Sequence, residues 1–332
     1  MGLRVAMAGV GRMGRQHAVN LAGLPGVDEL LVVDADADAA RRVASELGAT
    51  AWASTEDALD RAEALVVAAA TDAHAGLVRA GIQRGLPIFC EKPLAADLDD
   101  TRALVEEVEQ AGIQLMMGFQ RRQDGAYREA RRLVETGELG TLYLLKLHAH
   151  DMDPPPASYI PTSGGIFRDS SIHDFDLLRW LTGQEVAELY AMGSVRIPEL
   201  FGEHDDVDTA AAAIRLTDGT LAVLGQTRHD PLGYDIRTEL IGSKQSIVVG
   251  LDARTPQRSL EPGVSPPERP YDGFLDRFAE AYREEMAVFI EVANGRRASP
   301  CTARDGLAAM RIADAASRSR QSGAVVHLSE SS

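Results

Sequence analysis

The chain has 332 residues, of which 45% are hydrophobic, and its formal net charge is −16. Such a charge argues against nucleic acids and anionic membrane surfaces as partners, and no apolar run approaches the roughly 20 residues that a membrane span needs. The two cysteines, Cys90 and Cys301, have no paired spacing, and the N-terminal residues do not resemble a signal peptide. We therefore expect a cytoplasmic protein without a disulfide framework or a cysteine zinc site.

The first 120 residues alternate between strand and helix patterns. Apolar runs typical of buried strands occur at residues 3–9, 29–34, 64–70, 86–91 and 114–119, and helical patterns separate them. Continuous apolar strands that alternate with helices indicate a parallel sheet covered on both faces. We therefore predict an α/β protein in which residues 1–120 form a doubly wound domain.

The pattern changes after residue 121. A helix at 125–135 precedes a strand at 142–150, and several directly joined strands lie between residues 185 and 250, which predicts a largely antiparallel sheet. The proline-rich residues 252–270 predict an exposed loop, and helices at 273–293 and 302–319 precede a short strand at 324–328. So few helices cover only one face of such a sheet. We expect residues 121–332 to form a second α/β domain whose open, apolar face joins subunits into a homo-oligomer.

A glycine-rich motif follows the first predicted strand directly and opens a helix. It reads Gly9-Val10-Gly11-Arg12-Met13-Gly14. In a nucleotide-binding βαβ unit, the first glycine permits the tight turn, the second lets the pyrophosphate approach the backbone, and the third allows close packing of helix on strand. The alternative is a glycine turn in a doubly wound sheet that binds another ligand.

An acidic residue, Asp34, ends the second predicted strand twenty residues after Gly14. A carboxylate at this position accepts hydrogen bonds from the adenosine ribose hydroxyls and repels a 2′-phosphate. Asp36 and Asp38 add negative charge, and no arginine follows Asp34 immediately. The motif therefore predicts NAD as the cofactor rather than NADP.

An isolated lysine, Lys92, lies in a Glu-Lys-Pro sequence at the end of the strand at 86–91. Open α/β sheets bind ligands at this carboxyl edge, so Lys92 is positioned to reach the reacting end of a dinucleotide. Lysine, unlike arginine, can share a proton, and only three of the 34 basic residues are lysines. The alternative is a solvated lysine paired with Glu91.

Asp169 and His173 are four residues apart, which places them one turn apart if the segment is a single helix, as we predict. A carboxylate that orients an imidazole is the arrangement that a proton-transfer site needs. The alternative is a surface electrostatic pair. Metal binding is not expected, because Asp174 lies about 100° around the helix from His173 and no second histidine follows.

These motifs together resemble the glucose–fructose oxidoreductase / inositol dehydrogenase / MocA family over nearly the whole chain, and within it the bacterial inositol 2-dehydrogenases. Further segments carry the resemblance: Gly118-Phe119-Gln120-Arg121-Arg122, Asp153-Pro154-Pro155-Pro156, Ser163-Gly164-Gly165-Ile166-Phe167-Arg168-Asp169 and Gly233-Tyr234-Asp235. The resemblance implies an N-terminal Rossmann domain and a C-terminal α/β domain with an open-faced sheet. It also implies a tetramer.

The resemblance assigns roles to individual residues. It implies that Lys92, Asp169 and His173 form the catalytic set, and that Arg121, His150 and Tyr234 contact a polyol together with Asp169 and His173. It places Thr71, His74, Glu91 and Gln120 on the cofactor side, with Gly9, Gly11, Arg12, Met13, Gly14 and Asp34. His148 lies two residues from His150 on the same predicted strand. Ala70 stands where family members often have proline, which leaves the local turn open.

The activity that these residues imply is the NAD-dependent oxidation of a ring hydroxyl of an inositol to the ketone. In this interpretation, His173 takes the hydroxyl proton and Lys92 stabilises the developing alkoxide. Two alternatives remain open. One is an oxidoreductase of the same family for a sugar, an amino-sugar or a dihydrodiol; the other is a non-enzymatic, NAD-binding sugar sensor, against which the combination of Lys92, Asp169 and His173 argues.

Overall fold

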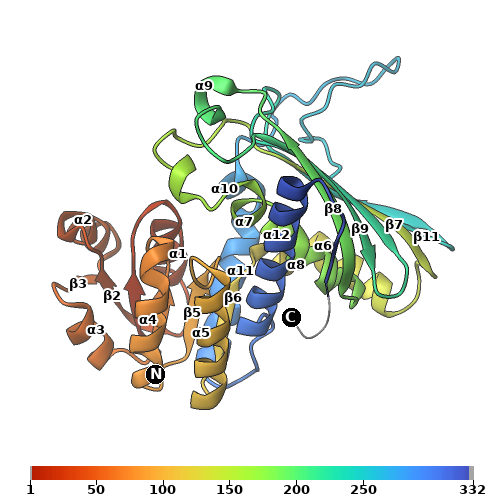
Figure 1. Ribbon diagram of the computed structural model, residues 1–332. Helices are drawn as coiled ribbons and strands as arrows, with labels where there is room; N and C mark the ends of the chain where they lie inside the picture. Colours follow the sequence, from red (N-terminus) through yellow and green to blue (C-terminus); the bar gives the residue numbers. More distant parts are fainter. Residues whose placement is uncertain (1, 329–332) are drawn as a thin grey trace. The chain divides into compact units, whose positions relative to one another are not determined.

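The chain forms two compact units in the computed structural model, which describes residues 2–328. The first unit contains the residues up to Gln123 together with Glu280–Ala308, and the second contains Asp124–Ala279 and the chain from Ala309 onward. The segment 280–308 therefore returns to a unit whose other residues lie far before it in the sequence (Figure 1). The periodicity of the sequence does not predict this return.

The first unit is built on a six-stranded parallel sheet with the order β3-β2-β1-β4-β5-β6. Its elements are β1 (Leu3–Ala8), α1 (Arg12–Ala22), β2 (Val27–Val33), α2 (Ala37–Leu47), β3 (Thr50–Ala51), α3 (Thr55–Arg61), β4 (Ala64–Val67), α4 (Thr71–Gln83), β5 (Ile88–Glu91), α5 (Leu98–Ala111), β6 (Leu115–Gly118), a 3-10 helix (Gln120–Gln123) and α11 (Ala279–Ala293). The order reverses between β1 and β4, and open α/β sheets bind ligands at such a switch point. The predicted doubly wound parallel sheet is confirmed.

The core of the first unit includes side chains from the late helix α11. Met286 and Phe289 are fully buried in one cluster with Val5, Val66 and Phe89 of the sheet. Each such side chain stabilises the fold by about 1.5–3 kcal/mol relative to an exposed one. The apolar face of α11 is therefore part of the first unit's core.

The second unit is built on a seven-stranded sheet with the order β12-β11-β7-β10-β9-β8-β13. Its elements are α6 (Gly125–Glu135), β7 (Leu142–His150), a 3-10 helix (Ile160–Thr162), α7 (Ile166–Asp169), α8 (Ile172–Thr182), β8 (Val186–Ser194), α9 (Pro198–Phe201), β9 (Thr209–Leu216), β10 (Leu221–Thr227), β11 (Asp235–Gly242), β12 (Ser246–Val249), α10 (Phe274–Arg277), α12 (Ala303–Ser322, which begins in the first unit) and β13 (Val326–His327). Only β7 and β10 pair in parallel among these strands. The prediction of a largely antiparallel sheet is confirmed.

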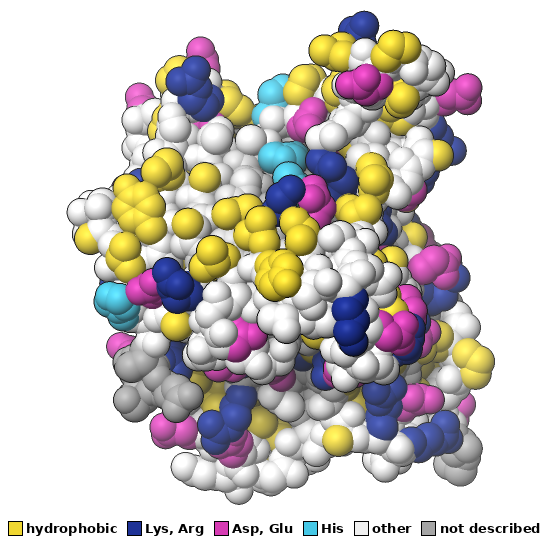
Figure 2. Space-filling view, turned by 90° about the vertical axis from the view of Figure 1, so that its right-hand side faces the viewer, with side chains coloured by type: hydrophobic (Ala, Val, Ile, Leu, Met, Phe, Trp, Pro, Cys, Tyr) yellow, Lys and Arg dark blue, Asp and Glu magenta, His cyan; other side chains and the backbone are white. Residues whose placement is uncertain are grey.

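One face of this second sheet is covered and the other is open. Helices α6, α8 and α12 lie along one face (Figure 1). Residues alternate accordingly along β10, where Ala222 and Leu224 are buried and Leu221 and Val223 are exposed. We call the uncovered surface around Ala211, Ala213, Leu221, Val223, Met192 and Val248 the open face. Figure 2 shows hydrophobic side chains gathered on this side of the molecule.

No helix within residues 2–328 is long and apolar enough to cross a membrane. Both cysteines, Cys90 and Cys301, are buried. The cytoplasmic location expected from the sequence stays a prediction.

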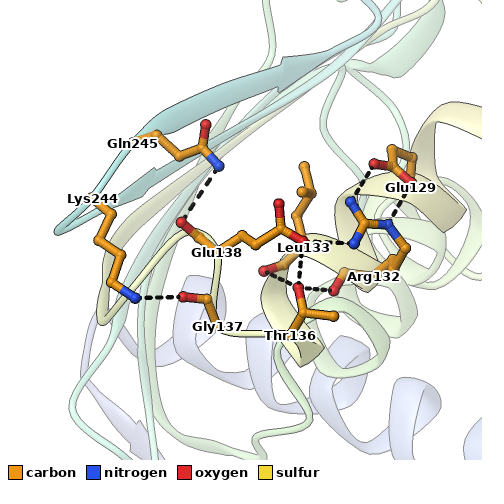
Figure 3. A network of polar contacts seen from close by, with 8 residues as sticks. All are labelled: Glu129, Arg132, Leu133, Thr136, Gly137, Glu138, Lys244 and Gln245. Atoms are coloured by element: carbon orange, nitrogen blue, oxygen red, sulfur yellow. Dashed lines mark hydrogen bonds and ion pairs between the residues drawn. The ribbon is translucent and has the colours of Figure 1, made fainter.

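A polar network joins the end of α6 to the turn between β11 and β12 (Figure 3). Arg132 donates to Glu129 at 2.9 Å and to Glu138 at 2.6 Å. Lys244 donates to the carbonyl oxygen of Gly137 at 3.0 Å. Ion pairs this exposed are screened by water and contribute little to stability, so we expect the close packing of the backbone in this region to contribute more.

Two glycines of this connection allow that packing to be tested. Gly137 and Gly140 both adopt the left-handed conformation, with φ of 70° and 75°, which costs other residues about 1–2 kcal/mol. A Cβ on Gly140 would also lie 2.2 Å from Oγ of Ser243, whereas a Cβ on Gly137 meets nothing within 4 Å. We predict that both Gly137→Ala and Gly140→Ala lower the melting temperature, and that Gly140→Ala lowers it more. Equal shifts in calorimetry would contradict the close approach to Ser243.

Candidate active site

The glycine-rich loop between β1 and α1 is shaped by two close contacts. A Cβ on Gly9, whose φ is +92°, would lie 2.4 Å from the backbone of Ala69. A Cβ on Gly14 would lie 2.0 Å from the carbonyl oxygen of Gly9. A Cβ on Gly11, in contrast, would meet no atom within 4 Å. The first and third glycines are therefore required by the protein's own packing, and the space beside Gly11 is open to a ligand.

The N-terminus of α1 fits an anionic group. Its N-cap is Gly11, which has no side chain to accept from the first main-chain N–H groups, and its first turn contains no acidic residue. Helices α2, α3 and α5 are instead capped by the side chains of Asp36, Ser54 and Asp97. Unsatisfied N–H groups and the helix dipole favour a phosphate at such an end. The loop and helix therefore fit the pyrophosphate of NAD.

Asp34, predicted to bind the ribose, also holds the loop. Its Oδ2 accepts from the main-chain N–H of Val10 at 2.7 Å, and its Oδ1 accepts from Asp36 at 2.8 Å. Each carboxylate oxygen keeps a further acceptor site for a ribose hydroxyl. Two arginines of α2 lie in this region, but Arg42 pairs with Asp36 at 3.7 Å and Arg41 with Asp38 at 2.5 Å. The local charge therefore favours a ribose hydroxyl over a 2′-phosphate.

The turn after β4 has the conformation that proline would impose. Ala70 has φ of −64°, close to the value of about −65° that a proline ring fixes. Thr71 is the first residue of α4, and its contact with the cofactor stays a prediction. The replacement of proline by Ala70 thus leaves the local geometry intact.

His74 is buried beneath this turn. Its Nδ1 lies 2.8 Å from the carbonyl oxygen of Pro93, and its Nε2 lies 3.1 Å from that of Ala69. Burial lowers the pKa of His74 in spite of these carbonyl groups, so the ring is neutral at pH 7 and donates to one of them. His74 thereby links the start of α4 to the chain just after Lys92. Its contact with a nicotinamide stays a prediction.

Lys92 directly follows β5 and is half-buried. Its main-chain N–H donates to Oε2 of Glu91 at 3.1 Å. The Oε1 of Glu91 lies 2.6 Å from Nε2 of His17, in the core. The carboxylate of Glu91 is therefore engaged within the protein, and a direct role of this residue in cofactor binding stays a prediction.

Gln120 and Arg121 belong to the 3-10 helix after β6, and all four residues of that helix are buried. The neighbouring Arg122 has a structural role, since it pairs with Asp305 at 3.0 Å and donates to the carbonyl oxygen of Pro300. The Arg121 side chain is 3% exposed. The assignments of Gln120 to the cofactor and of Arg121 to the substrate stay predictions.

The prediction of one helix that carries both Asp169 and His173 is wrong. Asp169 is the last residue of α7, and His173 is the second residue of α8. The helix is interrupted because the N–H of Ser171 bonds back to Ile166 at 3.0 Å and its hydroxyl binds the side chain of Gln226. Serine side chains that find such partners compete with regular helix. The role of Asp169 as a partner of His173 stays a prediction.

Two residues that the sequence analysis does not select hold the carboxylate of Asp169. Arg228 approaches its Oδ2 at 2.9 Å, and the hydroxyl of Tyr159 donates to its Oδ1 at 2.9 Å. Arg228 is 4% exposed and also lies 3.5 Å from Asp151. Burial opposes the charge of Arg228, but Asp169 and Asp151 outweigh it and raise the pKa of the guanidinium. Arg228 directly follows β10, and such a strand end is a position at which a site residue could have been sought.

His150 and Tyr234 lie at neighbouring strand ends. His150, the last residue of β7, pairs in register with Thr227 of β10 and Asp235 of β11, and its Nδ1 lies 2.9 Å from Oγ1 of Thr227. Burial lowers the pKa of His150, although Asp235 opposes the shift. Tyr234 immediately precedes β11, is 7% exposed and packs against Phe278. The sheet thus brings these side chains to one end.

His148 shares a face of β7 with His150, because side chains two apart in a strand point the same way. Its Nε2 lies 3.6 Å from Oε1 of Glu239, and Lys146 donates to Glu239 at 2.9 Å. This face is the one that the helices leave uncovered. His148 is thereby part of the polar centre of the open face, and the substrate role of His150 stays a prediction.

Comparison with known proteins gives matches over both units. Residues 3–119 match a family model described as "Oxidoreductase family, NAD-binding Rossmann fold", and residues 127–248 match the "GFO/IDH/MocA C-terminal domain". The chain is 40% identical over 328 residues to a myo-inositol dehydrogenase of Streptomyces leeuwenhoekii. The alignment covers 97% of this chain and 99% of that protein.

Solved structures agree with these matches. A myo-inositol dehydrogenase from Corynebacterium glutamicum gives a TM-score of 0.91 at 32% identity, with 100% of both chains covered. A scyllo-inositol dehydrogenase from Lactobacillus casei, solved with bound NAD(H) and scyllo-inositol, gives 0.87 at 25% identity and covers 98% of this chain and 99% of that one.

The environment of Asp34 predicts a cofactor preference that can be reversed in part. We expect a higher kcat/KM with NAD⁺ than with NADP⁺, because Asp34 repels a 2′-phosphate and Arg41 and Arg42 are already paired. Asp34→Ser should shift the ratio of the two kcat/KM values towards NADP⁺ by roughly tenfold, or about 1.4 kcal/mol. Steady-state kinetics with both cofactors measure this ratio. A wild-type preference for NADP⁺ would refute the assignment of Asp34.

Proposed function

Because this chain belongs to the GFO/IDH/MocA oxidoreductase family, we propose that it oxidises a ring hydroxyl of an inositol to the ketone with NAD⁺ as the hydride acceptor. This proposal is supported by the similarity of the chain to inositol dehydrogenases over its full length, and by the presence of Lys92, Asp169 and His173. Bound NAD⁺ supplies the hydride acceptor at nicotinamide C4. The protein supplies binding, orientation and proton transfer.

We assign the proton step to His173. As the C–H bond of the substrate breaks and its hydride leaves, the hydroxyl proton passes to the imidazole, and the C–O bond becomes the carbonyl of the product. Lys92 donates a hydrogen bond to the developing alkoxide and lowers the energy of the transition state. Asp169 stabilises the imidazolium that forms.

The contacts of Asp169 support this last role. A general base works best when its partner carboxylate is charged throughout the cycle, and Arg228 at 2.9 Å favours the ionised form of Asp169. The hydroxyl of Tyr159 donates to the other oxygen. These two donors fix the carboxylate in one orientation, so that Asp169 is pre-organised for its role.

A substrate panel tests the proposed function. NADH formation is followed by absorbance with NAD⁺ and, in turn, myo-, scyllo- and chiro-inositol, glucose and xylose. We expect the highest kcat/KM with one of the inositols. A higher value with glucose or xylose would favour a sugar oxidoreductase of the same family, and NADH binding without turnover of any compound would favour a sensor.

Variants of the proposed catalytic set test the mechanism. We predict that His173→Ala lowers kcat by roughly 10²–10⁴-fold, which is typical of a general base, while the Kd for NADH changes little. Lys92→Arg should also lower kcat strongly, because arginine keeps the charge but cannot share a proton and has a side chain of different length. Fluorescence titration with NADH provides the binding control. Near-normal turnover in either variant would refute its assigned role.

We also infer that the open face joins subunits. Met192, Leu221 and Val223 are 52%, 44% and 41% exposed on it, and a monomer rarely exposes so large an apolar surface. Around them lie Ala211 and Ala213, whose small side chains allow a second sheet to approach closely. A symmetric pair of such faces gives a dimer, and a dimer of dimers gives the tetramer that the family resemblance favours.

Light scattering tests this assembly. We expect about four chain masses for the wild-type protein, whose chain mass is 35.7 kDa. Val223→Glu should reduce the assembly, because it would bury a charge at the interface. Val19→Glu, at a residue of α1 with a similar exposure of 40%, is the matched control. A wild-type monomer, or equal masses for Val223→Glu and the wild type, would contradict the role of the open face.

A further inference from the structure

Three ionisable side chains meet in the core of the first unit, and one of them directly precedes Lys92 in the sequence. His17 lies on α1, Glu91 ends β5 and Glu285 lies on α11, and they are 0%, 9% and 1% exposed. One nitrogen or oxygen atom of each lies within 4.8 Å of the others. The mechanism proposed above uses none of the three, and no sequence motif predicts that they meet.

The contacts of Glu91 connect this cluster to Lys92. Its Oε1 lies 2.6 Å from Nε2 of His17, and its Oε2 accepts from the main-chain N–H of Lys92 at 3.1 Å. Room for the carboxylate exists because residue 118 is glycine: a Cβ on Gly118 would lie 3.1 Å from Oε2. His17 therefore orients the carboxylate that holds the backbone of the catalytic lysine.

Glu285 is unusual because it is a buried carboxyl group without a hydrogen-bond partner among the described residues. Neither of its carboxyl oxygens has a hydrogen-bond partner among the described residues, and the same holds for Nδ1 of His17. The ionisable groups that face Glu285 are Glu91 from β5 and His17 from α1, whose ring also contacts Tyr282 of α11. Burial, with a further contribution from Glu91, raises the pKa of Glu285 well above its usual range. Burial and the neighbouring carboxylate therefore both disfavour the ionised form of Glu285.

The spacing argues against a metal ion as the explanation. Two ligands of one zinc ion, each at about 2.0–2.1 Å in tetrahedral geometry, lie about 3.3 Å apart. The 2.6 Å between His17 and Glu91 is instead the distance of a short, direct hydrogen bond. An ionised Glu285 in this position would be disfavoured by burial and by the neighbouring Glu91.

We propose that His17 and Glu285 are positioning residues for Lys92, which act through the carboxylate of Glu91 and require Glu285 to be uncharged. The proposal rests on the function proposed above for Lys92. As long as Glu285 keeps its proton, the pair of His17 and Glu91 is undisturbed and the backbone of Lys92 is held. Ionisation of Glu285 at alkaline pH places two carboxylates side by side, which displaces Glu91 and with it Lys92.

Thermal unfolding tests the charge state of Glu285 without any substrate. A carboxyl group whose pKa is raised in the folded state contributes stability that is complete below its unfolded pKa and is lost as the pH rises towards the folded pKa. Glutamine cannot ionise. The melting temperature of Glu285→Gln minus that of the wild type should therefore increase as the pH is raised from 5 to 9. The matched control is Glu280→Gln at an exposed position of the same helix. A constant difference across this pH range would overturn the proposal.

Kinetics test the connection to Lys92. We expect Glu285→Gln to keep kcat within about threefold at pH 7 and to retain activity at alkaline pH where the wild type loses it. His17→Leu should lower kcat at least tenfold with little change in KM or in the Kd for NADH, whereas His17→Gln, which can still donate to Glu91, should restore most of kcat. Full kcat in His17→Leu, or an alkaline loss in Glu285→Gln equal to that of the wild type, would overturn the proposal.

These outcomes are distinct from failure of the proposed function. A wild-type enzyme inactive with every compound of the panel would refute the function, and the unfolding experiment would still decide the charge of Glu285. A rise in wild-type melting temperature with added Zn²⁺ that is absent in Glu285→Gln would show a metal site instead and would overturn the hydrogen-bonded cluster.

Discussion

The close approach of α1 to β1 constrains the whole nucleotide-binding side of the molecule. Gly14 lies so near the carbonyl oxygen of Gly9 that no side chain fits between them, and Asp34 holds the intervening loop through Val10. This packing aims an uncapped helix N-terminus at the space beside Gly11. The same helix carries His17 into the core, where it meets Glu91. The loop that fits a pyrophosphate and the strand that presents Lys92 are therefore coupled through one rigid helix.

Charge is arranged differently in the two units. In the first, the carboxylate of Glu91 is hydrogen-bonded to an imidazole, and burial together with Glu91 raises the pKa of the neighbouring Glu285. In the second, Asp169 faces the permanently charged Arg228. Arginine does not release its proton, so this partner of Asp169 stays charged over the working pH range. The environment of each carboxyl group thus follows from the identity of its neighbouring residues.

Local patterns in the sequence predict the features that depend on local interactions. The parallel strands, the glycine loop and Asp34 at the end of β2 all follow from apolar periodicity and motif spacing, because each is determined within about thirty residues. Contacts between segments that are distant in the sequence cannot be predicted from such local patterns. The interruption of the helix at Ser171 depends on a hydrogen bond to Gln226, and the orientation of Asp169 depends on Arg228. Glu285 lies near Glu91 although almost two hundred residues separate them in the sequence. Periodicity shows which face of a helix is buried, but it does not show what that face is buried against.

The contribution of α11 to the first core has a consequence for biosynthesis. Met286 and Phe289 complete a cluster that otherwise consists of N-terminal residues such as Val5 and Val66. During translation, the nucleotide-binding half leaves the ribosome long before this helix and exposes an apolar flank until the helix arrives. The order of synthesis is therefore not the order of folding: the N-terminal half reaches its final state only after α11 has been made, and the second sheet is covered only once α12 has followed.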